Sequence, residues 1–211
     1  MEGSREASGY FPGRAAPEAE GQEENVRRPL IVTAIVVAAA FAAPAAAELP
    51  KSLEELQARI ASEARTPRGA AKLWFDAVFV YTHVDKELGA QMITEMSYDK
   101  HWQKTQRYLP KTLEESPYVF RSYAAGATPE NDYAMDPQSY ELTVVRENAK
   151  PYGDKPANDY VKIFVSSSGA STPRPMTLRR NARGEYKAYE VGAIYTMVRE
   201  PASEKAKKEN F

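Results

Sequence analysis

The chain has no cysteine among its 211 residues. Disulfide bonds, catalytic thiols and cysteine-ligated metals are therefore excluded. Lipid attachment behind a signal peptide is excluded too, because that modification needs a cysteine. Histidine is scarce: His83 and His101 are the only two, and neither has a second histidine at a spacing typical of metal ligands. We expect no metal site, and nothing in the sequence indicates a cofactor.

The chain also lacks a surplus of either charge, since it has 28 Lys and Arg residues and 29 Asp and Glu residues. Domains that bind nucleic acid usually present a basic face, so this balance gives no support for a nucleic-acid partner. Long hydrophobic runs are equally rare. The one that stands out is Leu30 to Ala43, an uncharged stretch near the N-terminus.

This hydrophobic run has the flanking residues of an export signal. Arg27 and Arg28 precede it, and the alanines at 45–47 follow it as the A-x-A pattern that signal peptidases read. We expect a general secretory signal over residues 26–47, cleaved between Ala47 and Glu48. The mature protein would then lie in the periplasm or outside the cell, without a stable membrane anchor. A retained anchor is the alternative, but a spanning helix needs about 20 predominantly apolar residues and this run is shorter.

Residues 1–25 do not look like part of that signal. They are rich in Glu, Gly, Ala and Pro, a composition that cannot form a hydrophobic core. Val26 stands directly before the two arginines, and valine codons can start translation in bacteria. Our hypothesis is that translation begins at Val26; the alternative is a genuine disordered leader. A peptide from residues 1–25 in the unprocessed precursor would contradict the hypothesis.

After Glu48 the chain is long enough for one domain with a normal core, which we place at 48–201, followed by a charged tail at 202–211 that frays. Helix signals come first. Capping residues predict helices near 53–64 and 67–83, the second being apolar almost all round and therefore the most buried. A third helix is expected after Asp85, and a fourth around 98–108 that ends at Pro110.

Strand signals follow a proline-rich segment. Residues 110–138 are predicted to be a long ordered loop that can hold one short strand at 118–123. Alternating apolar residues then predict strands near 139–145, 159–166 and 175–180, with Val161, Ile163 and Val165 on one face. A long final strand is expected at 185–198, with a bulge at Gly192. Helices followed by strands indicate an α+β fold, in which N-terminal helices pack on a curved antiparallel sheet of about four strands.

Two resemblances follow from these residues. The order of elements, with the "RGEYKAYEV" stretch at 183–191, resembles the cone-shaped superfamily of nuclear transport factor 2. The pattern SY-x-x-GATPEN-x-Y … SSGA-x-x-PR resembles an uncharacterised bacterial family of exported domains, and this resemblance implies no activity. The matching residues are Ser122, Tyr123, Gly126 to Asn131, Tyr133, Ser167 to Ala170, Pro173, Arg174, Leu178 and Arg179.

The same two segments hold the candidate ligand site. An arginine fork beside hydroxyls and an amide suits a carboxylate or a phosphate. The alternative is structural: Arg121 or Arg174 pairs with Asp132 or Glu130 and holds the long loop in place. If the two segments meet, the candidate ligand-binding residues are Arg121, Tyr123, Asn131, Asp132, Ser167, Ser168 and Arg174.

Asp76 is the one candidate for catalysis. It lies in the middle of an apolar helix, where a buried carboxylate must be paired or shift its pKa. With Tyr189 or Tyr195 it would form the general base of a cone-fold hydrolase or isomerase. The alternative is that Asp76 faces solvent or pairs with Lys72.

Three functions stay open from the sequence. The leading hypothesis is a non-enzymatic exported domain that binds a small anionic ligand or an envelope protein. A hydrolase or isomerase that uses Asp76 is the second. A structural protein of the cell envelope is the third.

Overall fold

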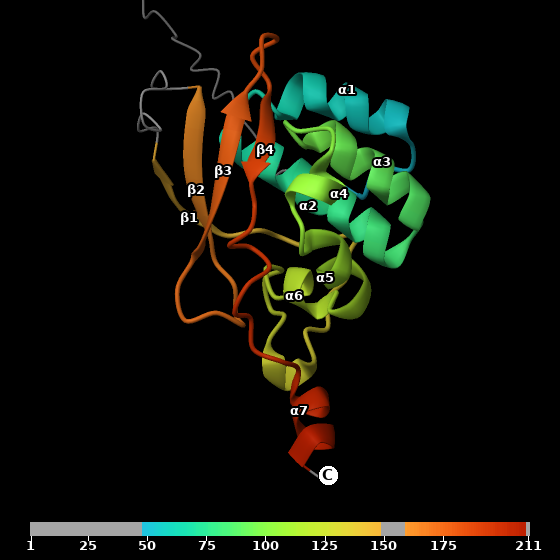
Figure 1. The fold of residues 1–211 in the computed structure, drawn as a ribbon, viewed down its shortest axis with the longest axis vertical. Helices are drawn as coiled ribbons and strands as arrows, with labels where there is room; N and C mark the ends of the chain where they lie inside the picture. Colours follow the sequence, from blue (N-terminus) through green and yellow to red (C-terminus); the bar gives the residue numbers. More distant parts are fainter. Residues whose placement is uncertain (1–47, 149–158, 210–211) are drawn as a thin grey trace, which may run out of the picture. The chain divides into compact units, whose positions relative to one another are not determined.

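The computed structural model describes residues 48–148 and 159–209, so the predicted leader and export signal lie outside the described residues. Helices come first (Figure 1): α1 (Leu53–Glu63), α2 (Pro67–His83), α3 (Lys86–Met96), α4 (Trp102–Thr105), α5 (Leu109–Glu115), α6 (Tyr118–Arg121) and the 3-10 turn η1 (Pro129–Asn131). The strands and a last helix follow: β1 (Val144–Asn148), β2 (Tyr160–Val165), β3 (Arg174–Arg180), β4 (Tyr186–Glu190) and α7 (Ala202–Glu209).

The predicted α+β class is confirmed. The strands form a sheet in the order β1-β2-β3-β4, and each neighbouring pair is antiparallel. Val161, Ile163 and Val165 of β2 are all buried, as their alternation predicts. Helix α2 packs against β2, β3 and β4 and crosses the sheet in Figure 1. The main core therefore lies between α2 and the sheet.

The first three helices begin where their capping residues predict. The side chains of Ser52, Thr66 and Asp85 accept hydrogen bonds from backbone N–H groups in the first turns of α1, α2 and α3. Every residue of α2 from 73 to 80 is buried, which confirms it as the most buried helix. Gly89 lets α3 approach α2 closely, because a Cβ at position 89 would lie 2.2 Å from the backbone nitrogen of Tyr81 in α2.

The proline-rich segment differs from the prediction. The fourth helix covers only 102–105, and Pro110 lies in the first turn of α5 instead of ending a helix. That position tolerates proline because its missing N–H would have no partner inside the helix. The strand predicted at 118–123 is wrong, since residues 118–121 form α6, which brings Val119 and Phe120 into the core.

The last predicted elements also need correction. The final strand ends at Glu190, because Val191 and Ile194 turn into the core and the N–H of Ile194 donates to the Val191 carbonyl. The bulge is in β4 at Tyr189, not at Gly192: Thr177 faces Glu190, while Leu178 faces Ala188. The tail predicted to fray forms α7 over 202–209.

Smaller differences concern the ends of the other elements. The first strand begins at Val144, and Leu142 makes only an isolated bridge with Ala124. Helix α7 is tied to η1, because the side chain of Asp132 accepts a hydrogen bond from the N–H of Ser203. In the described residues, no helix combines the length and the apolar character needed to cross a membrane.

The outer edge of β4 is covered by the segment that follows α3. Ser97 forms a parallel bridge with Ala188, and the N–H of Tyr98 donates to the Ala188 carbonyl at 2.7 Å. Further along, Nε2 of Gln106 donates to the Tyr189 carbonyl at 3.3 Å. Side chains from the helical segment and from the sheet thus meet beside β4.

Candidate functional site

Asp76, the predicted catalytic candidate, is fully buried and held by three donors. Nη2 of Arg59 lies 2.9 Å from one carboxylate oxygen. Nζ of Lys72 and the hydroxyl of Tyr140 lie 2.5 Å and 2.6 Å from the other. The pairing with Lys72, one helical turn earlier, is confirmed. The pairing with Tyr189 or Tyr195 is wrong, because Tyr140 occupies that place.

This arrangement suits a structural ion pair better than a base. Burial, reinforced by the Asp76 carboxylate, raises the pKa of Tyr140 well above its usual range, so its hydroxyl stays a donor. The Arg59 guanidinium also bonds Glu63, which balances the charges of the group. A carboxylate that accepts three such bonds is a poor acceptor for a substrate proton.

The two segments of the predicted ligand site do meet. The hydroxyls of Ser122 and Ser167 lie 2.7 Å apart, and both are buried. The backbone N–H and the hydroxyl of Ser168 donate to the Ser122 carbonyl at 3.0 Å and 3.2 Å. The contact therefore consists of bonds between the segments themselves, through Ser122, which was part of the family pattern but not of the predicted site.

Two other predicted ligand residues serve the backbone. Oδ1 of Asn131 accepts from the N–H of Thr128 at 2.8 Å, and its amide donates to the Gly126 carbonyl at 3.0 Å. Asp132 takes a left-handed backbone conformation, with φ at 54°, and caps α7. Asn131 thus holds the 3-10 turn in place, as turn residues commonly do, and Asp132 ties that turn to α7.

Tyr123 and the two arginines complete the predicted set. The hydroxyl of Tyr123 donates to the Ile194 carbonyl at 2.7 Å, and Nη2 of Arg174 donates to the Met197 carbonyl at 2.9 Å. In the described residues neither Arg121 nor Arg174 forms an ion pair with Glu130 or Asp132. The ion pairs of the structural alternative are therefore wrong: hydroxyl and carbonyl contacts join the two segments. Nε of Arg121 and Nε of Arg174 are buried without a hydrogen-bond partner in the described residues.

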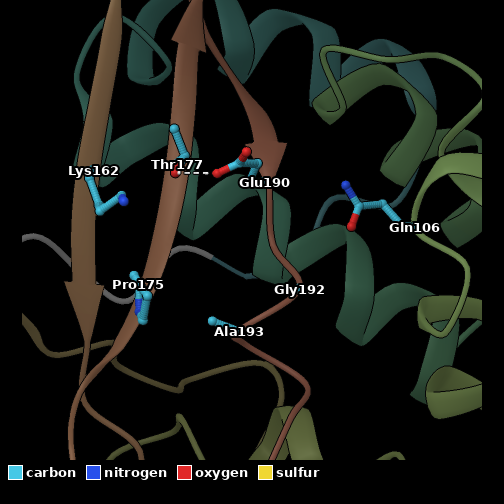
Figure 2. A pocket seen from close by; sticks show the side chains of 7 residues that line it. All are labelled: Gln106, Lys162, Pro175, Thr177, Glu190, Gly192 and Ala193. Carbon is cyan, nitrogen blue, oxygen red and sulfur yellow. Dashed lines mark hydrogen bonds between the residues drawn. The ribbon is translucent and has the colours of Figure 1, made fainter. Parts of the chain in front are cut away.

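A cavity of about 320 Å³ lies elsewhere, beside β4. Figure 2 shows the amino group of Lys162 turned toward β3, and Gln106 approaching from the other side. Thr177 lies between them, and its hydroxyl donates to the Glu190 carboxylate at 3.2 Å (Figure 2). The lining residues are Gln106, Lys162, Pro175, Thr177, Glu190, Gly192 and Ala193.

The sheet register explains how these polar residues come together. Lys162 of β2 lies opposite Thr177 of β3, and Thr177 lies opposite Glu190 of β4. The three side chains thus form a row across the strands, with an ammonium at one end and a carboxylate at the other. A cavity of this size with a few convergent polar groups has the features of a small-molecule site.

Sequence reasoning missed this cavity. Alternation did place Lys162 on the face opposite the core, but an exposed lysine in a strand is ordinary. Glu190 joins the row only because the bulge at Tyr189 shifts β4 by one residue. Gln106 follows the end of α4, inside the range that was predicted to be helical. A polar residue in the middle of each of two neighbouring strands is the only signal that could have suggested it.

The histidines lie apart. The His83 ring packs against Phe79, and its Nδ1 lies 2.8 Å from the Thr82 hydroxyl. Burial and the nearby Arg121 charge lower the pKa of His83. Within residues 48–148 and 159–209, no group of three His, Asp or Glu side chains could hold a metal ion.

The fold and the cavity define an α+β domain in which polar side chains line a hollow beside the last strand of an antiparallel sheet. The chain belongs to a family described as a domain of unknown function (DUF6935), whose model matches residues 48–202. No curated protein and no solved structure matches it. The predicted membership in an uncharacterised domain family is confirmed, whereas the resemblance to nuclear transport factor 2 stays a prediction.

Proposed function

We propose that this domain is exported and binds a small zwitterionic ligand, such as a free amino acid or a short peptide, in the cavity of Figure 2. The observation that carries the proposal is the row of side chains from Lys162 to Glu190 across a hollow of about 320 Å³. A carboxylate on the ligand would pair with Lys162 and an ammonium with Glu190.

The neutral groups of the cavity favour the same ligand class. Thr177 offers a hydroxyl, and Gln106 an amide, next to the charged pair. Gly192 has no side chain and Ala193 has only a methyl group, which leaves room for the ligand, while Pro175 supplies an apolar wall. Opposite charges at fixed positions select orientation as well as composition, since a reversed ligand would meet like charges.

Export is supported by the pattern of residues 26–47. A hydrophobic run after two arginines and before A-x-A is typical of a cleaved signal. The family match begins at Glu48, the residue that would follow cleavage. N-terminal sequencing of the protein recovered outside the cytoplasm should begin at Glu48; a chain that keeps residues 26–47 would contradict cleavage.

The binding proposal is tested by thermal shift and calorimetry on the purified chain. Free amino acids and dipeptides form the first panel. N-acetyl amino acids, which lack the ammonium, and amino-acid amides, which lack the carboxylate, form two matched panels. We expect only zwitterions to raise the melting temperature strongly, because each derivative loses one of the two charge pairs.

Variants assign each charge. Lys162→Met should abolish discrimination between an amino acid and its amide, and Glu190→Gln should abolish discrimination against the N-acetyl derivative. Lys111→Met is the matched control, because Lys111 is an exposed lysine on α5, paired with Glu115 and outside the cavity lining. Equal responses from zwitterions and both derivative panels, or full binding by Lys162→Met, would overturn the proposal.

A further inference from the structure

A second cavity, of about 330 Å³, holds a buried lysine. It lies among α1, the end of α3 and the start of β4, and is separate from the cavity of Figure 2. Lys187 is only 5% exposed, and its Nζ donates to the Glu95 carbonyl at 2.9 Å. The residues that line it are Gln57, Ile60, Ala61, Glu95, Arg183, Glu185 and Lys187.

The hydrogen bonds of Lys187 are incomplete. An ammonium has three donors, and in the described residues only the Glu95 carbonyl accepts one of them. Two N–H groups are left for the cavity. A buried ammonium that is so poorly solvated disfavours its charged form.

The charged neighbours of Lys187 come from the end of α3 and the segments next to it and to β4. Helix α1 contributes only the uncharged Gln57, Ile60 and Ala61 to the cavity lining. Glu185 and Glu95 favour the ammonium, whereas Lys100 and Arg183 oppose it. Burial has the largest effect, and the pKa of Lys187 is lowered to about 8. Near pH 7.5 roughly a quarter of this amine is then neutral, against about one part in a thousand for an ordinary lysine.

A purely structural role would be to cap the C-terminus of α3. A basic side chain there stabilises the last carbonyls of a helix. Lys100 already does this from the solvent: its Nζ donates to the Thr94 carbonyl at 3.0 Å, and its side chain is 52% exposed. A second, buried lysine adds little to the cap, and the cap does not explain the cavity beside it.

We infer that this second cavity binds a small 2-oxo acid or related carbonyl compound, with Lys187 as the nucleophile that forms an imine. The juxtaposition behind the inference is a buried amine, the Glu185 carboxylate two residues earlier, just before β4, and Arg183 at the cavity edge. The Arg183 side chain is 73% exposed and would reach the carboxylate of the ligand.

The chemistry balances without any further reactant. The lone pair of the neutral Nζ attacks the carbonyl carbon, and the carbonyl π electrons move to oxygen, which gives a carbinolamine. The C–O bond then breaks and a C=N bond forms, while the oxygen leaves as water with the two protons lost by the amine. Glu185 accepts and returns a proton in these steps; its Oε2 accepts bonds from Asn181 and Arg183, and no hydrogen bond to its Oε1 is found in the described part of the chain.

The test is imine trapping on the purified chain. Glyoxylate, which carries a carboxylate, and propanal, which does not, are each added with sodium cyanoborohydride, which reduces the imine to a stable secondary amine. Peptide mass mapping then compares each lysine over pH 6 to 10. We expect the Lys187 peptide to be labelled at least about tenfold faster than the Lys100 peptide near pH 7.5, because of its larger neutral fraction.

Variants separate the roles at the site. Lys111→Met, at an exposed lysine of α5 outside this cavity, should leave the adduct at Lys187 unchanged. Arg183→Gln should slow labelling by glyoxylate more than labelling by propanal, because it removes the partner of the ligand carboxylate as well as a charge that opposes the Lys187 ammonium. Labelling of Lys187 in the wild-type chain no faster than that of Lys100, or a pH profile of Lys187 that matches that of Lys100, would overturn the inference. The peptide mapping uses wild-type protein, so the test does not depend on whether a Lys187→Met variant folds. Amino-acid binding at the cavity of Lys162 is measured separately, so failure of one proposal leaves the other intact.

Discussion

Asp76 and Lys187 are two buried charges in one domain, and their surroundings differ. Asp76 has no exposed surface and accepts bonds from Arg59, Lys72 and Tyr140. Lys187 is 5% exposed, donates one bond in the described residues and lines a cavity. A buried charge whose bonds are all made by the protein fixes structure. A buried charge with unused donors and room beside it is available to a ligand.

The energetic reason is the cost of taking an ion out of water, which is several kcal/mol per ion even after the protein relaxes. At Asp76 this cost is offset by two cations and a hydroxyl. At Lys187 it is offset in part, and the shortfall appears as a lowered pKa. Substitutions at the two positions should therefore have very different effects on stability.

Removal of the carboxylate should have the largest effect. Asp76→Ala leaves Lys72 partly buried without its carboxylate and Arg59 with Glu63 alone. We therefore expect the free energy of unfolding to fall by about 3–5 kcal/mol. Urea unfolding followed by circular dichroism measures it. Asp85→Ala is the control, because it removes an exposed carboxylate that caps α3 and should cost only about 1 kcal/mol. A loss at Asp76 no larger than that of the control would show that the charge group is not structural.

Removal of one donor to Asp76 should cost less. Tyr140→Phe keeps the ring, which packs edge-on against Phe79 at 4.5 Å between centroids, and removes only the hydroxyl. A hydrogen bond to a charged group contributes about 1.5–3 kcal/mol, so a loss in that range is expected in the same urea experiment. Tyr195→Phe is the matched control, since its hydroxyl bonds the neutral amide of Gln106. Equal losses in the two variants would mean that the charge of Asp76 adds nothing to the bond.

The sequence predicts one part of the Asp76 group and not the rest. Lys72 lies one helical turn before Asp76, so the pair follows from helical spacing alone. Arg59 belongs to another helix, and Tyr140 lies 64 positions away in the sequence, in the segment before β1. Local patterns cannot identify such partners, because packing of α1 and of the segment before β1 onto α2 brings them close.

The strands show the same limit. Alternation correctly places Val161, Ile163 and Val165 toward the core, since a side-chain period of two is a local property. It fails for β4, where the bulge at Tyr189 changes the register and the chain leaves the sheet after Glu190. Both cavities lie beside this irregular strand and use side chains from the helical part of the chain, distant in sequence, so neither could be predicted from strand patterns.

Substitution of Lys187 should have the smallest effect on stability, and its pH dependence distinguishes it from Asp76. Lys187→Met loses one bond to a backbone carbonyl but also removes a poorly solvated charge, so near pH 7 the change should stay within about 1.5 kcal/mol of zero.

The pKa of Lys187 is lower in the folded chain, about 8, than the 10.5 of an unfolded lysine. Between these values the unfolded chain binds more protons, so the wild type gains stability as pH rises from about 8 toward 10.5, and below 8 the penalty is fully present. Relative to Lys187→Met, the wild-type free energy of unfolding should therefore increase across that window when urea unfolding is repeated at several pH values. A flat difference between the wild type and Lys187→Met would mean that the Lys187 ammonium is well solvated in the folded chain, and would place it with the fully satisfied charges that Asp76 represents.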